Sequence, residues 1–167
     1  MKCYLDSSAV LKLILEEPES ADFRAVVEAF HADGVTFVTS VLTGVEVARA
    51  LRRCVVNGRL SPADLQAGWE TALKGVMMAA ISPAMLDEAK IVGNDELRSL
   101  DAIHLATAHV VHADVVFTYD ERLIQACMEA GVMTARPGVS DVKLPPGWGW
   151  IINDDDWPDD ANLPPGW

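Results

Sequence analysis

Short apolar runs alternate with longer helix-like segments along most of this chain. The runs at 2–5, 35–38, 76–81, 115–118 and 132–134 have the length and the apolar, β-branched or aromatic content of strands. The segments between them carry helix-starting residues, apolar residues at helical spacing and glycine stops. Strands that alternate with helices at this spacing predict a mainly parallel sheet between two layers of helices, a three-layer α/β/α fold.

Capping residues set the expected limits of the helices. Ser7 or Ser8 is expected to cap a first helix, and Pro18 suits the first turn of a second helix that runs to about Ala32. Later helices are expected from Ser40 or Thr43 to about Val56, from Ser61-Pro62 onward, from Ser82-Pro83 to about Gly93-Asn94, from a Ser99 cap to about His112, and from an Asp120 cap to Gly131.

The chain changes character near residue 138. Half of its 167 residues are hydrophobic and 23% are charged, which is typical of a globular protein, and we expect one domain over 1–137. The segment 138–167 is rich in Trp, Pro and Asp and repeats Leu-Pro-Pro-Gly-Trp, a sequence that favours extended backbone. Two interpretations of this tail stay open. It is a flexible acidic or non-native extension, or a segment whose Trp148, Trp150 and Trp157 dock on the protein or on a partner.

Cysteine usage and hydropathy indicate a cytoplasmic protein without a membrane-spanning segment. Cys3, Cys54 and Cys127 are far apart, odd in number and without metal-ligand spacing, so we expect reduced thiols. The N-terminus has no apolar signal region, and no uncharged apolar run approaches the roughly 20 residues of a membrane helix. The net charge of -12 argues against a generic nucleic-acid binder, because such proteins normally carry a basic face.

Four acidic residues stand where the predicted elements can bring them together. Asp6 and Asp120 follow strand-like runs, whereas Glu46 and Asp101 interrupt helix-like runs. Ligands of open α/β sheets bind beyond the carboxyl ends of the strands, so the four side chains can converge in one acidic pocket. Two carboxylates about 5 Å apart repel by roughly 3 kcal/mol at an effective dielectric near 20. Such a pocket calls for Mg²⁺ or Mn²⁺, which acidifies a bound water and stabilises a leaving oxygen, as in phosphodiester hydrolysis.

Each acid also has a structural explanation. Asp120 can be an N-cap, Asp101 can favour a helix N-terminus, and Glu46 can pair with an arginine on its own helix. Asp6 is the hardest to explain by structure alone, because it is a charge at the end of a central strand. A haloacid-dehalogenase-like phosphatase would need a second Asp where Ser8 stands, and an Asp-x-Ser-x-Ser metal site would need Ser where Val10 stands.

Other polar residues near the acids give weaker indications. His104 lies three residues after Asp101 in an apolar helix run, which favours a packed or capping histidine over a catalytic base. Arg49 lies three residues after Glu46, where it contacts a substrate phosphate or is simply solvated; both interpretations stay open.

Taken in order, the motifs around the acids resemble a known family. Tyr4-Leu-Asp-Ser-Ser-Ala-Val-Leu-Lys12, Glu46 followed by Arg49, Leu100-Asp-Ala-Ile-His-Leu-Ala-Thr-Ala108 and Phe117-Thr-Tyr-Asp120 resemble the PIN-domain ribonucleases. The likeness is to VapC-type toxins of type II toxin–antitoxin systems and covers about residues 1–137.

The resemblance implies an Mg²⁺- or Mn²⁺-dependent endoribonuclease that cleaves structured RNA, forms a homodimer and is covered by a cognate antitoxin. It makes Asp6, Glu46, Asp101 and Asp120 the acidic quartet. We expect Asp6, Asp101 and Asp120 to ligate the metal and Glu46 to orient its water. Ser8 and Thr118 match small polar positions that support the metal shell or the substrate. Two rival hypotheses are a catalytically silent PIN-like module that binds protein or RNA, which the negative net charge favours, and a nuclease directed at DNA.

Overall fold

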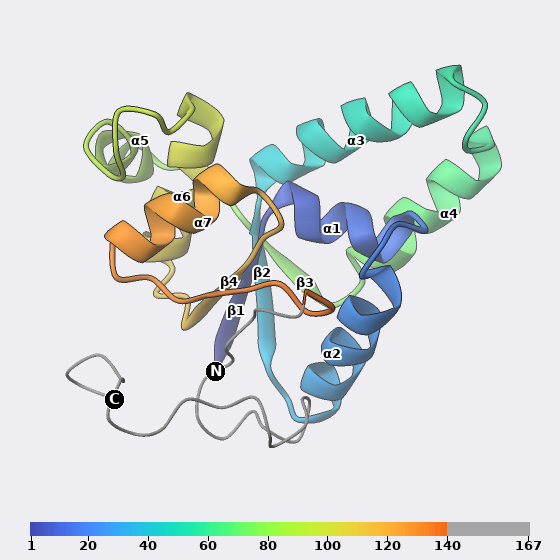
Figure 1. Ribbon diagram of the computed structural model, residues 1–167, viewed down its shortest axis with the longest axis horizontal. Coiled ribbons are helices and arrows are strands. Elements are labelled where there is room, and N and C mark those ends of the chain that lie inside the picture. The colour runs from blue at the N-terminus through green and yellow to red at the C-terminus, as the bar shows by residue number, and fades with distance from the viewer. Residues whose placement is uncertain (140–167) are drawn as a thin grey trace.

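Five parallel strands form the centre of the molecule (Figure 1). The computed structural model describes residues 1–139, so the predicted docking of Trp148, Trp150 and Trp157 lies outside the described residues. The strands are β1 (Lys2–Leu5), β2 (Thr36–Ser40), β3 (Val76–Ala79), β4 (Val115–Phe117) and β5 (Thr134–Ala135), in the order β3-β2-β1-β4-β5. The first strand of the sequence is therefore the central strand of the sheet.

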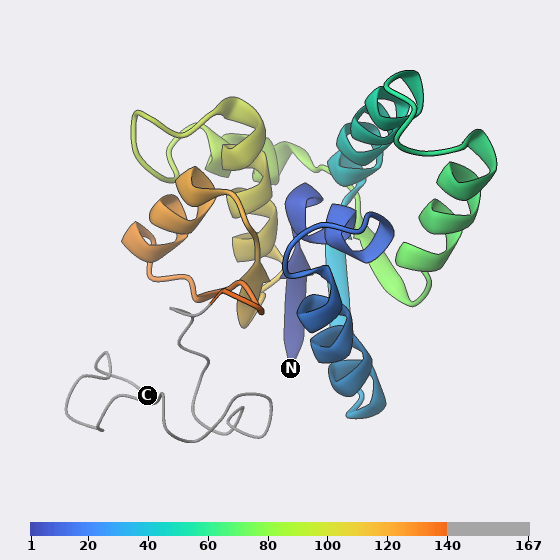
Figure 2. The ribbon, with the colours of Figure 1, turned by 45° about the vertical axis from the view of Figure 1, so that its right-hand side comes forward.

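Seven helices connect the strands over the described residues. They are α1 (Ser7–Ile14), α2 (Ser20–Ala32), α3 (Val41–Val56), α4 (Pro62–Ala72), α5 (Pro83–Ala89), α6 (Ser99–Val110) and α7 (Glu121–Glu129). Figures 1 and 2 show α1 to α4 on one side of the sheet and α5 to α7 on the other. The predicted three-layer α/β/α fold with a mainly parallel sheet is confirmed.

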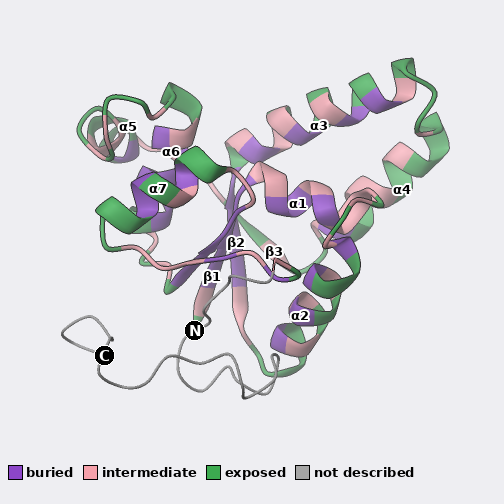
Figure 3. Ribbon diagram, viewed as in Figure 1, coloured by how far each residue is buried: buried purple, intermediate pink, exposed green. Residues whose placement is uncertain are grey.

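Side-chain alternation along β1 divides the core between the two faces of the sheet. Cys3 and Leu5 pack on one face with residues of α1 to α4, whereas Tyr4 packs on the other with residues of α6 and α7. All three side chains are fully buried. Figure 3 shows the buried residues along the central strands and on the sheet-facing sides of the helices, while β3 at the edge is partly exposed.

Several predicted helix limits are wrong. Asp6, not Ser7 or Ser8, caps α1, because its carboxylate accepts the backbone N–H of Ala9. Arg98, not Ser99, is the N-cap of α6. Its backbone is extended, and its carbonyl accepts the first helical hydrogen bond, from the N–H of Ala102. The helix from Pro83 ends at Ala89, where the following N–H groups fold back to the carbonyl of Glu88.

The second helix begins two residues later than its proline suggested. Lys12, which is buried, donates to the carbonyl of Pro18 at 2.8 Å and pairs with Glu19 at 2.9 Å. These bonds fix a turn in which Glu19 has a left-handed φ of 66°, so α2 begins at Ser20. The strand predicted at 132–134 is likewise shifted to Thr134–Ala135.

Among residues 1–139, the helices are too short or too polar for any of them to cross a membrane.

Candidate active site

Two of the predicted site residues meet because their strands are neighbours. Leu5 at the end of β1 lies opposite Phe117 at the end of β4, so Asp6 and Thr118 leave the sheet side by side. The backbone N–H of Asp6 continues this pairing to the carbonyl of Phe117 at 3.2 Å. The carboxyl edge of the sheet therefore places Asp6 as the sequence predicted.

The Asp6 carboxylate is buried and held by three hydrogen bonds. Its Oδ1 accepts from the Ser8 hydroxyl at 2.7 Å and from the Ala9 N–H at 2.8 Å, and its Oδ2 accepts from the Thr118 hydroxyl at 2.7 Å. Burial raises the pKa of this carboxyl; nearby His104 and the three hydrogen bonds oppose the shift without cancelling it. The hydrogen bonds thus fix the orientation of the Asp6 carboxylate, while burial disfavours its charged form.

Ser8 and Thr118 connect Asp6 to the loop after β4. The Ser8 hydroxyl accepts the N–H of Tyr119 at 2.7 Å, and the Thr118 hydroxyl accepts the N–H of Asp120 at 3.1 Å. Both hydroxyls therefore donate to one acid while they hold the backbone that leads to another.

Asp101 carries a buried oxygen without a partner. It lies in the first turn of α6, and its Oδ2 is the one buried side-chain N or O atom of residues 1–139 that lacks a hydrogen bond. Burial and the charges of Asp120 and Glu46 raise the pKa of Asp101, whereas His104 and Arg98 act in the opposite direction. Asp120 and Glu46 therefore lie near enough to Asp101 for their charges to act on it.

Asp120 has the structural role that its position suggested and also faces Asp101. It caps α7 through Oδ1, which accepts the N–H of Arg122 at 2.8 Å and that of Leu123 at 3.4 Å. The side chain is half-buried, and its charge acts on Asp101. The N-cap interpretation and the convergence of the acids are therefore compatible.

Glu46 is bonded to side chains from two other helices. It accepts from the hydroxyl of Ser7 and from Nε2 of His104, the latter at 2.7 Å. Burial works to raise the pKa of Glu46, but these two hydrogen bonds and the charge of His104 outweigh it and lower the pKa. Within residues 1–139 Glu46 forms no ion pair with an arginine, and Arg49 is exposed one turn further along α3.

The contact between His104 and Glu46 is what sequence reasoning missed. His104 is buried, as predicted for a packed histidine, but its ring also joins Glu46 to Tyr4. The spacing of His104 from Asp101 could have predicted this contact. Residues three apart lie on the same face of a helix, so His104 lies on the side of α6 that carries Asp101.

The donor chemistry of this cluster suits a hard divalent cation. Carboxylate oxygens are its preferred ligands, and the unpaired Oδ2 of Asp101 is a buried acceptor that a cation would satisfy. Within residues 1–139, however, no three Asp, Glu, His or Cys side chains lie close enough together to coordinate one metal ion. The carboxylates of the cluster are nonetheless ligands of the type that such an ion binds. The Asp6 carboxylate also accepts hydrogen bonds from Ser8, Ala9 and Thr118.

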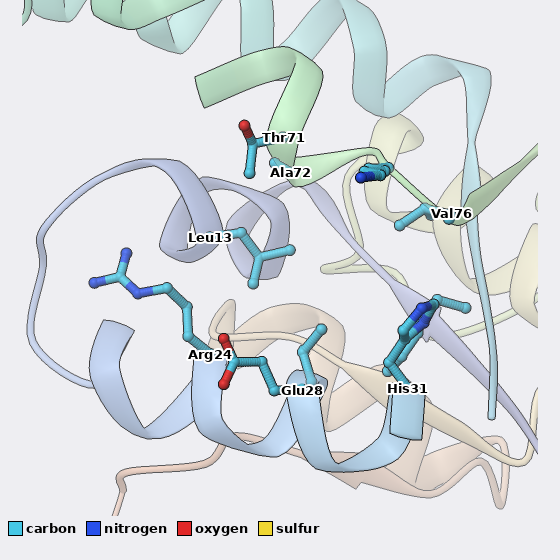
Figure 4. A pocket seen from close by; sticks show the side chains of 11 residues that line it. Leu13, Arg24, Glu28, His31, Thr71, Ala72 and Val76 are labelled. Carbon is cyan, nitrogen blue, oxygen red and sulfur yellow. The ribbon is translucent and has the colours of Figure 1, made fainter. Parts of the chain in front are cut away.

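A pocket of about 630 Å³ lies elsewhere, between α1, α2, α4 and the strands β2 and β3 (Figure 4). Leu13, Phe37 and Val76 give it an apolar lining, and Arg24 and Lys74 stand among the charged residues around it. None of the four acids lines it, so it is separate from the candidate active site.

Comparison with known proteins identifies the family. Residues 3–128 match the PIN domain. The chain belongs to this family. Curated relatives of this PIN-domain chain include Ribonuclease VapC47 of Mycobacterium tuberculosis, 35% identical over 81% of the chain and 96% of the relative. Ribonuclease VapC46 of the same species is 37% identical over 80% of the chain and 96% of that relative. The resemblance inferred from the four motifs is confirmed.

Solved structures support the PIN-domain fold. Mycobacterium tuberculosis VapC20, described as a sarcin-ricin loop cleaving toxin, matches with a TM-score of 0.61 at 18% identity, covering 81% of this chain and 99% of that one. VapBC2 from Rickettsia felis, bound to a DNA fragment from its promoter, matches with a TM-score of 0.60 at 14% identity, covering 82% and 99%. At these identities the likeness establishes the fold alone.

Proposed function

We propose that this PIN-domain protein is a metal-dependent endoribonuclease and the toxin of a toxin–antitoxin pair. Its curated relatives are named as VapC ribonucleases, and the match covers nearly their whole length. Their names favour an active enzyme over a silent binding module. The matched domain contains Asp6, Glu46, Asp101 and Asp120 in the order in which the family has its acids. We therefore propose these four as the active-site residues.

The observation that carries the proposal is the unpaired, buried oxygen of Asp101 beside other acids. An unsatisfied buried acceptor costs about 1–3 kcal/mol, and more when it is charged. The charges of Asp120 and Glu46 add to this cost, as the raised pKa of Asp101 indicates. A fold that keeps this arrangement is suited to a positive ligand.

Asp6, Asp101 and Asp120 are the residues proposed to hold Mg²⁺ or Mn²⁺. Such a cation supplies Lewis acidity towards a phosphate group and makes nearby water more acidic. The protein's own part is to orient the acids. Ser8 and Thr118 fix the Asp6 carboxylate, and the N-cap bonds fix one oxygen of Asp120.

Glu46 is proposed to orient the attacking water. Its lowered pKa keeps it ionised at neutral pH, so it can accept a hydrogen bond from water. Arg49, exposed one turn along α3, is proposed to contact a phosphate of the RNA. Ser8 and Thr118 stay proposals as supporting residues of the metal shell or substrate.

Partners follow from the same proposal. One matched solved structure is a toxin–antitoxin complex from Klebsiella pneumoniae, with a TM-score of 0.52 at 18% identity, and VapBC2 of Rickettsia felis is another match. These matches support a cognate antitoxin. Val41 and Val45, exposed apolar side chains four residues apart on α3, support a homodimer surface on that helix. We propose a cytoplasmic location with reduced thiols, because all three cysteines are free and buried.

The test is cleavage of total RNA by the purified protein with Mg²⁺, with Mn²⁺ and with EDTA. We expect cleavage with either metal, none in EDTA, and recovery when excess metal is returned. Asp6→Asn should lower the rate more than about 100-fold, since changes to residues behind the ligands already cost 10–100-fold. Asp95→Asn removes the same charge from an exposed loop and should cleave normally.

Two outcomes would contradict parts of this proposal. Equal cleavage in EDTA would exclude the metal, and normal cleavage by Asp6→Asn would exclude the assigned site. Binding of RNA without any cleavage would instead favour the silent module. Single-stranded DNA in a parallel reaction distinguishes a DNA-directed nuclease from a ribonuclease.

A further inference from the structure

A chain of side-chain hydrogen bonds runs from the buried core to the candidate active site through His104. The hydroxyl of Tyr4 lies 2.7 Å from Nδ1 of His104, and Nε2 of the same ring lies 2.7 Å from Oε2 of Glu46. Tyr4 is 0% exposed and His104 is 3% exposed, so the ring has no water to replace either partner. The aromatic rings also meet edge to face, with centroids 5.9 Å apart.

Each member of this chain comes from a different element. Tyr4 is on β1, Glu46 on α3 and His104 on α6, and Ser7 at the start of α1 reaches Glu46 as well. Figures 1 and 2 show the start of α1 between α3 and α6. The bonds therefore connect elements that are distant in the sequence.

The hydrogen-bond partners assign one tautomer to the His104 ring. The Glu46 carboxylate only accepts, so Nε2 carries the hydrogen of that bond. Nδ1 is then the acceptor and Tyr4 the donor. Burial, assisted by the charge of Asp6, raises the pKa of Tyr4, which keeps its hydroxyl protonated and able to donate.

Glu46 needs such support because the carboxylate of Asp101 lies near enough to repel it. Its charge raises the pKa of Asp101, which means that the two carboxylates repel each other. A glutamate has three rotatable side-chain bonds, and its side chain here is 23% exposed, so repulsion would turn it outward. The bonds from His104 and Ser7 hold the carboxylate in one position against this repulsion.

We propose that His104, held in one tautomer by Tyr4, is a positioning residue that fixes Glu46 for RNA cleavage. The inference rests on the proposed function and assigns a role to a histidine that touches neither the metal ligands nor the substrate in that proposal. Tyr4 acts one step further back, by keeping Nδ1 as an acceptor so that Nε2 presents its hydrogen to Glu46.

The test compares His104→Leu, His104→Gln and Tyr4→Phe with the wild-type protein in the Mg²⁺-dependent RNA assay. His104→Leu should lower kcat by about 10–100-fold with KM changed less than about threefold, the range typical of residues that orient active-site ligands. His104→Gln should recover most of kcat, because its amide N–H reaches the place of Nε2–H. Tyr4→Phe should lower kcat less, because it removes only the hydroxyl.

A double-mutant cycle separates positioning from a general loss of structure. If His104 acts through Glu46, adding His104→Leu to Glu46→Gln should change kcat less than about twofold. Val116→Ala is the matched control, since Val116 is buried in the same cluster as Tyr4 and its apolar side chain forms no hydrogen bond with the acids. It should lower Tm and leave kcat of the folded protein unchanged. Independent, multiplying effects of the His104 and Glu46 variants would overturn the proposal.

A readout without RNA keeps this inference distinct from the proposed function. The carboxyl ¹³C resonance of Glu46, followed by NMR in EDTA, should titrate at higher pH in His104→Leu than in the wild type, since the variant loses the bond that lowers the pKa. An unchanged Glu46 titration would overturn positioning even in an active nuclease. A shifted titration in a protein that cuts no RNA would refute the proposed function and leave the contact intact.

Discussion

At the scale of single residues, the site holds carboxylates whose charged forms the fold disfavours. Burial is the first cause of the raised pKa of both Asp6 and Asp101, and Asp101 is raised further by its acidic neighbours. The two acids differ in their bonds, because Asp6 is fully hydrogen-bonded and Asp101 keeps one oxygen unpaired. The carboxylates alone are thus electrostatically unfavourable, and a positive ligand should relieve Asp101 most.

Asp101→Asn should therefore stabilise the metal-free protein. An acid whose pKa is raised by folding holds more protons in the folded than in the unfolded state, so its contribution to stability falls as pH rises above its ordinary value of 3.8. The difference in unfolding free energy between variant and wild type should grow from pH 4 towards 7 and reach about 0.5–1 kcal/mol, because solvent screens a half-exposed group. Urea unfolding in EDTA measures it, with Asp95→Asn as control. A variant less stable than wild type at pH 7 would contradict the strain argument.

The placement of Asp6 and Asp120 at the sheet edge could be expected from the sequence, but the hydrogen bonds of the site could not. Asp6 and Asp120 follow strands, and parallel strands end at one edge of a sheet, so local pattern was sufficient to place them. The bond between His104 and Glu46 depends on how α3 and α6 pack around the start of α1, which no local pattern encodes. Likewise, Asp6 displaced the neighbouring serines as cap because the end of β1 aims its carboxylate at the Ala9 N–H.

At the scale of elements, α3 and α4 contain glycines that behave differently although both are helical. A Cβ on Gly68 of α4 would lie 2.6 Å from Cγ2 of Ile14, at the end of α1. A Cβ on Gly44 of α3 would lie 3.7 Å from the Trp69 ring, an ordinary van der Waals contact. Gly68 thus permits the close packing of α4 on α1, whereas Gly44 carries the cost of a helical glycine without such a packing reason.

Replacing each glycine by alanine should change stability in opposite directions. Gly44→Ala should raise the unfolding free energy by about 0.5–1 kcal/mol through helix propensity. Gly68→Ala should lower it by about 1 kcal/mol or more, because overpacking against a β-branched side chain costs more than the propensity gains. Urea unfolding of both variants measures the pair, and a stabilising Gly68→Ala would show that α1 and α4 separate easily.

At the scale of the whole molecule, the described residues form a five-stranded sheet with a core on each face. The predicted division into a domain at 1–137 and a tail at 138–167 remains a prediction. It agrees with the extent of the family match, which ends at residue 128.

A chain that ends at Val139 should fold and cleave RNA like the full-length protein. We expect its Tm to change by less than about 4 °C, the shift that corresponds to 1 kcal/mol in a domain of this size. Thermal melting, gel filtration and the RNA assay provide the comparison. A larger loss of Tm, or a changed oligomeric state, would instead support docking of Trp148, Trp150 and Trp157.

The strand order also governs when the site can exist. The strand made first, β1, is central and needs β4 as a neighbour, and the bond from Thr118 to Asp6 spans 112 residues. Contacts between such distant segments form late in folding. Asp6 and Glu46 are therefore synthesised long before Asp120, and Asp101 only shortly before it. The carboxylate site of this chain can therefore be assembled only when translation of the domain is nearly finished.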